Sequence, residues 1–450
     1  MGGGGWFRRL GCALALGVLA GCSGNGGGAG GGATGGTSGG NSNFMTMGML
    51  GNPSLAVIVS NLVFADAAIN SSGGNAVVID SGSPVVLLNG DPGVFSGLSL
   101  PATQQVTVDF AFLDTGGTPI VTIDNIPAIQ LTTQMGTVAG LAGLAGIMGG
   151  DVLRDFSVQL DYAAPMMKGF CLGCSAGPRD DVSSPGTAIA FTLAGGGGQL
   201  MLNGDASAPV SIPATRIPVT VSIDGTDTAH THTFILDTGA SEVTVTSAVY
   251  QSLIADGRAQ LAGGLAISTV ANNMEGGSVT RAKTITVGGE TVLDAPVLTV
   301  ASDQLLGSLG TELGHPVDGL LGGSYLRNFL VTIDYPGGQL HLQRYATPPI
   351  ADEFRRVGFM IAPSSDGSTF AVTHVYPGSD AAMKGVAAGD QVLAINGATL
   401  DPKTQSLTAD GLLDGTPGTT IPIQFGTTTS AALANRTVDL RVDDLIPNPQ

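Results

Sequence analysis

Three short motifs in the sequence could each present a carboxylate for acid–base chemistry. They are the tripeptides Asp80-Ser81-Gly82, Asp114-Thr115-Gly116 and Asp237-Thr238-Gly239, and each follows two apolar residues. Two aspartates held about 3 Å apart cannot both ionise cheaply, so they share one proton and can act together as base and acid. A single such tripeptide is often only a turn. The chemistry therefore depends on which elements bring two of them together.

An internal repeat divides most of the chain into two related parts. Residues 146–162 read GIMGGDVLRDFSVQLDY and residues 319–335 read GLLGGSYLRNFLVTIDY, which agree at nine of seventeen positions. A match of this length points to a duplicated unit rather than to chance. We therefore expect two lobes, at about 46–205 and 206–350.

The spacing to the repeat separates the three tripeptides. Asp80 and Asp237 precede their copies by 66 and 82 residues, so the first lobe is sixteen residues shorter between these landmarks. The glycine of the third tripeptide lies 30 residues before its copy, the same spacing as the second glycine of the turn at 288–289. Asp114 therefore maps to a hairpin turn, and Asp80 is the expected partner of Asp237.

The elements around these motifs are predicted to be strands. Alternating apolar residues, as in 219–223, and frequent glycine turns favour β-structure. In each repeat, Gly-apolar-apolar-Gly predicts a tight turn beside an aspartate loop, then one helical turn and a strand ending in Asp-Tyr. A shorter match of 197–202 with 337–342 extends the repeat, with a cysteine-containing segment inserted in the first copy.

These motifs resemble those of the pepsin-like and retropepsin-like aspartic peptidases. The second lobe carries LDTGAS at 236–241 and DGLLG at 318–322, which fit the bacterial retropepsin-like pattern well. The resemblance implies a mainly β, bilobed fold, with one aspartate per lobe meeting at a pseudo-two-fold axis and a polypeptide substrate in the cleft between the lobes. It gives Asp80 and Asp237 as the catalytic pair, with support from Ser81, Gly82, Thr238, Gly239 and Ser241.

The first lobe departs from the family pattern. Pepsin-like enzymes cover the cleft with a hairpin that bears a tyrosine, and no tyrosine lies between Asp80 and Gly146. The second lobe offers residues 269–277 as a flap-like hairpin. Two alternatives to a single-chain endopeptidase therefore stay open: an inactive bilobed protein that binds peptides, and a homodimer that pairs the Asp237 lobes of two chains.

A separate domain is expected at 351–447. GDQVLAING at 389–397, with Pro-Gly-Ser upstream, is similar to PDZ domains. The resemblance implies that Gly358, Phe359 and Met360 present a peptide-binding edge, where a C-terminal peptide ligand adds as a strand. A proline-containing linker at 346–349 would join this module to the lobes.

The first 22 residues read as an export signal. Arg8 and Arg9 precede an apolar run, and the run ends in Leu-Ala-Gly-Cys, which resembles the lipobox of bacterial lipoproteins. The resemblance implies a signal peptide at 1–21, lipid attachment at Cys22 and a membrane-anchored protein facing the periplasm or the cell surface. Ser23 follows the cysteine, which favours the outer membrane. Residues 22–45 are rich in Gly and Ser and read as a tether.

Cysteine content and charge narrow the partners. Export leaves Cys171 and Cys174 in the mature fold, and in an oxidising compartment this spacing favours a short-loop disulfide. No further ligands lie nearby to make a zinc site, and no cofactor motif occurs. The formal net charge of −18 leaves no basic surface for nucleic acid.

Overall fold

The computed structural model is mainly β, which confirms the expected fold class. The described residues contain no helix that is both long and apolar enough to cross a membrane. Cys22, Cys171, Cys174 and Asp114 lie outside the described residues, as do the expected signal peptide and tether. The structure describes residues 58–59, 62–89, 105–113, 119–130, 144–163, 166–168, 186–200, 209–268, 274–300, 302–350, 352, 354–364, 367–402 and 406–446.

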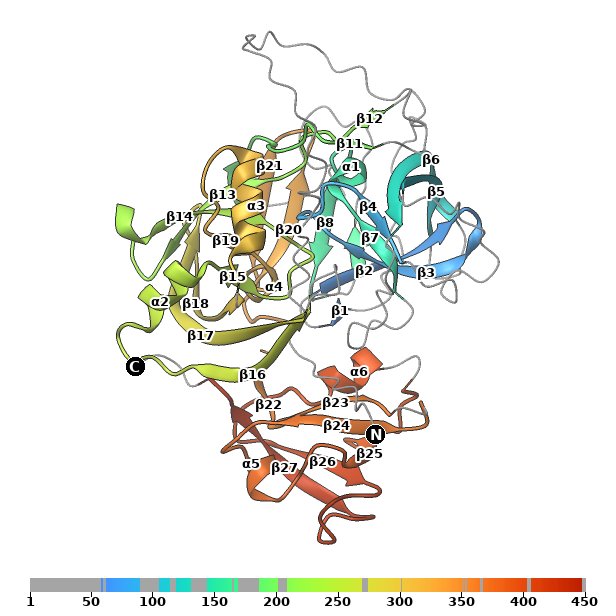
Figure 1. Cartoon of the computed structure of the whole chain (residues 1–450), viewed down its shortest axis with the longest axis vertical. Coiled ribbons are helices and arrows are strands. Elements are labelled where there is room, and N and C mark those ends of the chain that lie inside the picture. Colours follow the sequence, from blue (N-terminus) through green and yellow to red (C-terminus); the bar gives the residue numbers. More distant parts are fainter. Residues whose placement is uncertain are drawn as a thin grey trace, which may run out of the picture.

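The first lobe is built on a seven-stranded sheet in the order β1-β2-β3-β7-β4-β6-β5, in which β2 also pairs with β5 (Figure 1). One helical turn, α1 (Gly150–Leu153), follows the sheet. The strands are β1 (Ile58–Val59), β2 (Leu62–Ile69), β3 (Ser72–Ile79), β4 (Val86–Leu88), β5 (Gln105–Leu113), β6 (Pro119–Gln130) and β7 (Leu144–Met148).

The second lobe has a sheet of the same kind, in the order β13-β14-β19-β15-β18-β17-β16, with β13 also paired to β17. Its helices are α2 (Ser247–Ile254), α3 (Gln304–Leu313) and α4 (Gly323–Leu326), besides a 3-10 turn at Thr228–His230. The strands are β13 (Pro218–Ile223), β14 (Thr231–Leu236), β15 (Val243–Val245), β16 (Leu261–Ser268), β17 (Met274–Val287), β18 (Glu290–Val300) and β19 (Gly319–Leu321).

Strand pairing shows that the sequence repeat is also a repeat in space. β3 pairs in parallel with β7 as β14 does with β19, and β4 pairs in parallel with β6 as β15 does with β18. The sixteen-residue shortfall of the first lobe therefore falls between β4 and β5, where the second lobe has α2 and β16. Residues 90–104 of that connection lie outside the described residues.

A five-stranded sheet joins the two lobes, in the order β10-β21-β20-β8-β9. β20 and β8, which come from the two copies of the repeat, pair antiparallel across it, with Val331 opposite Leu160. The strands are β8 (Ser157–Asp161), β9 (Met166–Lys168), β10 (Thr187–Ala190), β20 (Phe329–Asp334) and β21 (Gln339–Arg344).

The expected match of 197–202 with 337–342 is wrong in space. The strand that follows β8 as β21 follows β20 is β9, whereas β11 (Gln199–Leu200) pairs with β12 (Val210–Ser211) in a separate two-stranded sheet. Gly-Gly-Gln-Leu is a short turn-and-strand sequence that many hairpins can use, so it carried little information about its partner.

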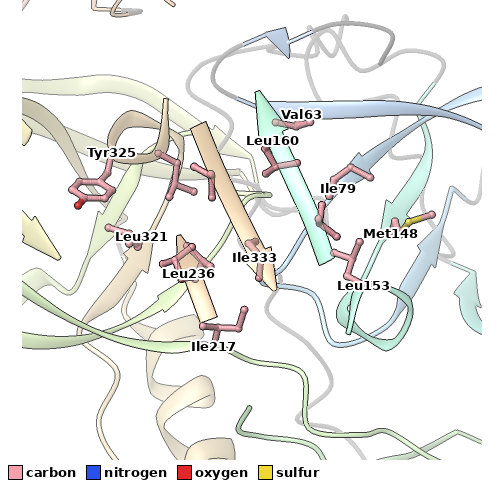
Figure 2. Close-up of a cluster of buried hydrophobic side chains, with 14 of the residues drawn as sticks. Val63, Ile79, Met148, Leu153, Leu160, Ile217, Leu236, Leu321, Tyr325 and Ile333 are labelled. Carbon is pink, nitrogen blue, oxygen red and sulfur yellow. The ribbon is translucent and has the colours of Figure 1, made fainter. Parts of the chain in front are cut away.

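One hydrophobic core runs through both lobes. Its buried members come from both sheets, and Figure 2 shows Leu160 and Ile333 on the paired strands, with Ile79 and Leu236 beside them from the strands that lead into the aspartate loops. Because this core is continuous, the two aspartate loops are held by one packed unit rather than by two lobes that pack separately.

The C-terminal domain is a six-stranded sheet with its own core, in the order β22-β27-β26-β25-β24-β23. Two short helices accompany it, α5 (Asp380–Met383) and α6 (Ser406–Gly411). The strands are β22 (Arg355–Val357), β23 (Phe359–Pro363), β24 (Phe370–Val375), β25 (Gln391–Ile395), β26 (Thr420–Phe425) and β27 (Thr437–Asp444).

This domain packs on the second lobe instead of hanging on its linker. Arg281 of β17 is buried and donates to Asp352 (2.6 Å), Asp444 (3.1 Å) and the carbonyl of Ile446 (2.6 Å). An apolar cluster surrounds these bonds and joins side chains from both sides. Its buried members are Val279 and Leu298 from the lobe, and Phe354, Met360, Tyr376 and Ile446 from the C-terminal domain.

Candidate active site

The loops that follow β3 and β14 meet where the two lobes join. The N–H of Ser81 donates to Oγ1 of Thr238 (2.9 Å), and the N–H of Thr238 donates to Oγ of Ser81 (3.1 Å). Each hydroxyl then donates across the junction, from Ser81 to the Leu236 carbonyl (2.9 Å) and from Thr238 to the Ile79 carbonyl (2.7 Å). These four buried bonds tie the loops together symmetrically.

Two glycines allow the loops to approach this closely. A Cβ on Gly82 would overlap the carboxyl group of Asp237, and a Cβ on Gly239 would overlap that of Asp80. Any larger residue at either position would have to push the opposite aspartate away. The Asp-[Ser/Thr]-Gly pattern is therefore explained residue by residue, with an acid, a cross-lobe hydroxyl and a space.

The Gly-apolar-apolar-Gly segments support the aspartate loops from behind. The Asp80 N–H donates to the Met148 carbonyl (3.0 Å) and the Asp237 N–H donates to the Leu321 carbonyl (3.1 Å). The glycines of these segments lie against backbone, where a Cβ on Gly149 or Gly322 would overlap a carbonyl oxygen of the neighbouring strand. The tight packing that the sequence predicts is what fixes each aspartate backbone.

The two carboxyl groups are buried and share a side-chain hydrogen bond. Burial raises the pKa of Asp80 to about 6, against the hydrogen bond from Asp237, Arg216 and two backbone N–H donors. Burial and the charge of Asp80 raise the pKa of Asp237 well above its usual value. A pair with both pKa values raised and a bond between its members holds one proton through the acidic range.

Backbone donors orient one oxygen of each carboxyl. Oδ1 of Asp80 accepts from the N–H groups of Gly82 (2.8 Å) and Ser83 (3.0 Å), and Oδ1 of Asp237 accepts from Gly239 (2.9 Å). Oδ2 of Asp80 has no N–H or O–H donor among the described residues. The geometry thus fixes one oxygen and leaves the other for the shared proton and for a reacting group.

The structure brings together Asp80, Asp237, Ser81, Thr238, Gly82 and Gly239, and it buries Ser241 beside them. Asp114 is in the connection between β5 and β6, a pair of antiparallel strands in which Leu113 lies opposite Pro119. In the second lobe, β16 and β17 form the expected flap-like hairpin, with Ser268 opposite Met274. Residues 269–273 at its turn lie outside the described residues.

One charged residue near the pair was not expected from the sequence. The guanidinium of Arg216 is 1% exposed and lowers the pKa of both carboxyls, against the raising effect of burial. Nothing in the local sequence marks this residue, because a lone arginine before a strand is usually a surface group. The described residues contain no cluster of His, Cys, Asp and Glu suited to a metal ion.

The residues expected to bind a peptide on the C-terminal domain have different surroundings. Phe359 lies in the core of that domain, Met360 packs against the second lobe, and a Cβ on Gly358 would overlap Ser379. Their side chains are therefore committed to packing. What they offer a ligand is backbone, because β23 is an edge strand of its sheet and has α6 beside it.

Comparison with known families agrees with this arrangement. Residues 219–325 match the Aspartyl protease family, a range that holds Asp237 but not Asp80, and residues 350–421 match the PDZ domain family. A search of curated proteins found no match. The chain therefore carries an aspartyl protease domain of the retropepsin-like type followed by a PDZ domain.

Proposed function

We propose that this protein is an aspartic endopeptidase that completes its active site within one chain, from Asp80 and Asp237. The observation that carries the proposal is the hydrogen-bonded pair of buried carboxyls inside a symmetric lock of four cross-lobe bonds. Two raised pKa values in contact are characteristic of groups that share a proton, which is the state an aspartic peptidase uses.

In this mechanism the ionised member of the pair accepts a proton from water as the water attacks the scissile carbonyl carbon. The shared proton moves to the carbonyl oxygen, which gives a tetrahedral diol. The diol collapses when its C–N bond breaks and a proton passes to the leaving nitrogen. Each step uses a carboxyl that the backbone N–H groups of Gly82, Ser83 or Gly239 already orient.

The same observation favours this proposal over the homodimer. In a homodimer that pairs two Asp237 lobes, a second copy of Asp237 would have to occupy the place where Asp80 lies. Asp80 is already bonded there through Ser81 and Thr238, and the core is continuous across both lobes. Opening this junction would expose apolar surface at about 25 cal/mol per Å².

The experiment is cleavage of a peptide library between pH 3 and pH 8 by the wild type, Asp80→Asn and Asp237→Asn, with Asp114→Asn as the matched control. Loss of either carboxyl should lower kcat/KM by about 10³-fold, because a general acid or base is removed. The control should match the wild type. An active Asp80→Asn variant would favour the homodimer, and a wild type that cleaves nothing would favour the peptide-binding alternative.

We also propose that the PDZ domain binds polypeptide chains at the edge of β23. The edge position of that strand and the neighbouring α6 support this assignment. A peptide that ends in a free carboxylate should bind more tightly than the same peptide with an amidated end. Equal affinity for both, measured by fluorescence anisotropy, would contradict the assignment.

Export and lipid anchoring through Cys22 form a further part of the proposal, and they rest on the Leu-Ala-Gly-Cys sequence alone. The wild type should partition into the detergent phase of an extraction. Cys22→Ser should stay unprocessed or move to the aqueous phase. Aqueous wild-type protein would refute the anchor.

A further inference from the structure

A buried cation lies beneath the junction of the two aspartate loops. Arg216 immediately precedes Ile217, whose carbonyl accepts from the N–H of Leu236 (2.9 Å), the residue before Asp237. On its other side, Thr215 packs so closely on Gly150 that a Cβ there would overlap it, and the Gly150 N–H donates to the Ser83 carbonyl (2.7 Å). The segment 215–217 therefore touches the support of both loops.

The guanidinium has one acidic partner away from the aspartate pair. Its Nη2 lies 3.4 Å from Oε2 of Glu312 on α3, and its Nε has no hydrogen-bond partner among the described residues. The Arg216 side chain is 2% exposed and that of Glu312 is 27% exposed. A buried guanidinium with a single long contact to a carboxylate keeps most of its charge uncompensated, so its field acts on its other neighbours.

A glycine makes room for this ion pair. Gly195 has a φ of +77°, and a Cβ on it would overlap Oε1 of Glu312 and press on Cγ of Arg216. The next residue, Gly196, donates its N–H to the same Oε1 (3.3 Å). The glycine run at 195–198 thus has a role that the sequence alone did not suggest, because it holds Glu312 at the edge of the buried cation.

We propose that Arg216 is a positioning residue for the shared proton, and that its fixed charge, offset by Glu312, sets the pH range in which the Asp80–Asp237 pair is singly protonated. This inference rests on the proposed function only for its catalytic meaning. The charged and titratable groups that face the pair are Arg216, behind it Glu312, and the Tyr335 hydroxyl. Burial and the two aspartates raise the pKa of Tyr335 above its usual range, so it stays neutral.

The sign of the effect follows from the charges. A nearby positive charge favours the ionised carboxyls, so removing it raises both macroscopic pKa values of the pair. Arg216→Met should shift both limbs of the kcat/KM profile to higher pH by about one unit, the lower end of the effect of an adjacent opposite charge. Glu312→Gln leaves the guanidinium less compensated and should shift the profile to lower pH. Arg216→Lys keeps the charge and should restore the wild-type profile.

Two measurements test this inference. The first is the pH profile of cleavage, with Arg356→Met as the control for loss of a buried arginine, because Arg356 is 3% exposed but lies in the PDZ domain. The second is carboxyl ¹³C NMR of aspartate-labelled protein, assigned with Asp80→Asn and Asp237→Asn, which reads the titration of the pair without any substrate.

The outcomes separate the two proposals. Opposite pH shifts for Arg216→Met and Glu312→Gln, with an unshifted control, support the role of Arg216. Unshifted carboxyl titrations in folded variants overturn it, even if activity falls at every pH. A wild type that cleaves nothing overturns the peptidase, while the carboxyl titrations still decide the role of Arg216. If Arg216→Met does not fold, the direction of the Glu312→Gln shift decides alone.

Discussion

The two lobes repeat one backbone plan but differ in a buried side chain behind each aspartate loop. In the second lobe, Oγ of Ser324 accepts from the Val243 N–H (2.9 Å) and donates to the Pro296 carbonyl (3.0 Å). At the matching place in the first lobe, Oδ2 of Asp151 accepts from the Val86 N–H (3.3 Å). Burial raises the pKa of Asp151 to about 7. The first lobe therefore supports its loop with a group that titrates, and the second with one that does not.

The lobes also differ in what is attached to them. The second lobe carries α2, the β16–β17 hairpin and the docked PDZ domain, whereas the first lobe is sixteen residues shorter at the matching connection. Symmetry is kept at the four bonds between the loops and is lost around them. The aspartate pair constrains both lobes equally, whereas the surroundings of each lobe are free to diverge.

The glycines provide the strongest test of the symmetry. Gly82→Ala and Gly239→Ala should each lower kcat/KM by about 10²-fold or more, because each added Cβ displaces the aspartate of the other lobe, and small misplacements cost about this much. Gly307→Ala is the control, since nothing lies near its Cβ in α3. A loss confined to one of the two variants would show that the lobes do not contribute equally.

The docked PDZ domain sharpens the difference between the lobes. Arg281→Met should lower the free energy of unfolding by about 3 kcal/mol, because it leaves Asp352 and Asp444 without their buried partner. The measurement is urea denaturation of the full chain. Lys283→Met, which breaks an exposed pair with Asp256, should change stability by less than about 0.5 kcal/mol.

Removal of the PDZ domain extends this test. Because Val279 and Leu298 would lose their apolar cover, truncation before residue 351 should destabilise the second lobe and reduce cleavage of short peptides as well as proteins. Loss on whole proteins alone would instead assign the domain to substrate capture through a flexible link. The two substrates therefore distinguish a buttress from a recruiting module.

The lock hydroxyls should behave as one unit. Ser81→Ala and Thr238→Ala each remove a donor and an acceptor, and each should cost roughly 1 to 3 kcal/mol of stability. The double variant should cost less than the sum, because the first change already breaks bonds of the second residue. Additive losses in thermal unfolding would contradict a coupled lock, and Ser81→Thr should preserve it.

The smallest expected effect separates Asp151 from Ser324. Since the folded-state pKa of Asp151 lies above its unfolded value, stability is full below about pH 4 and falls as the pH rises through about 7. Asp151→Ser should therefore stabilise the protein at pH 8 by on the order of 2 kcal/mol and change little at pH 4. Ser324→Ala should cost the same at both pH values. A pH-independent effect of Asp151→Ser would contradict the comparison.

Local and periodic features of the sequence predicted much of this molecule. The repeat located both aspartate loops, excluded Asp114 through its spacing to a hairpin, and indicated the glycine turns behind Gly149 and Gly322. These predictions succeeded because each depends on neighbouring residues: a strand needs alternating apolar positions, and a close approach needs a glycine.

The tertiary structure alone decided which distant residues meet. Arg216 and Glu312 are far apart in the sequence, and so are Arg281 and its partners Asp352 and Asp444, yet each pair forms a buried contact. The packing of Met360 on the second lobe, and the choice of β9 over residues 197–202 as the matching strand, were also settled there. No spacing rule links such residues, because their contacts follow from how whole sheets pack, and a single charged or apolar side chain carries no mark of the surface it will meet.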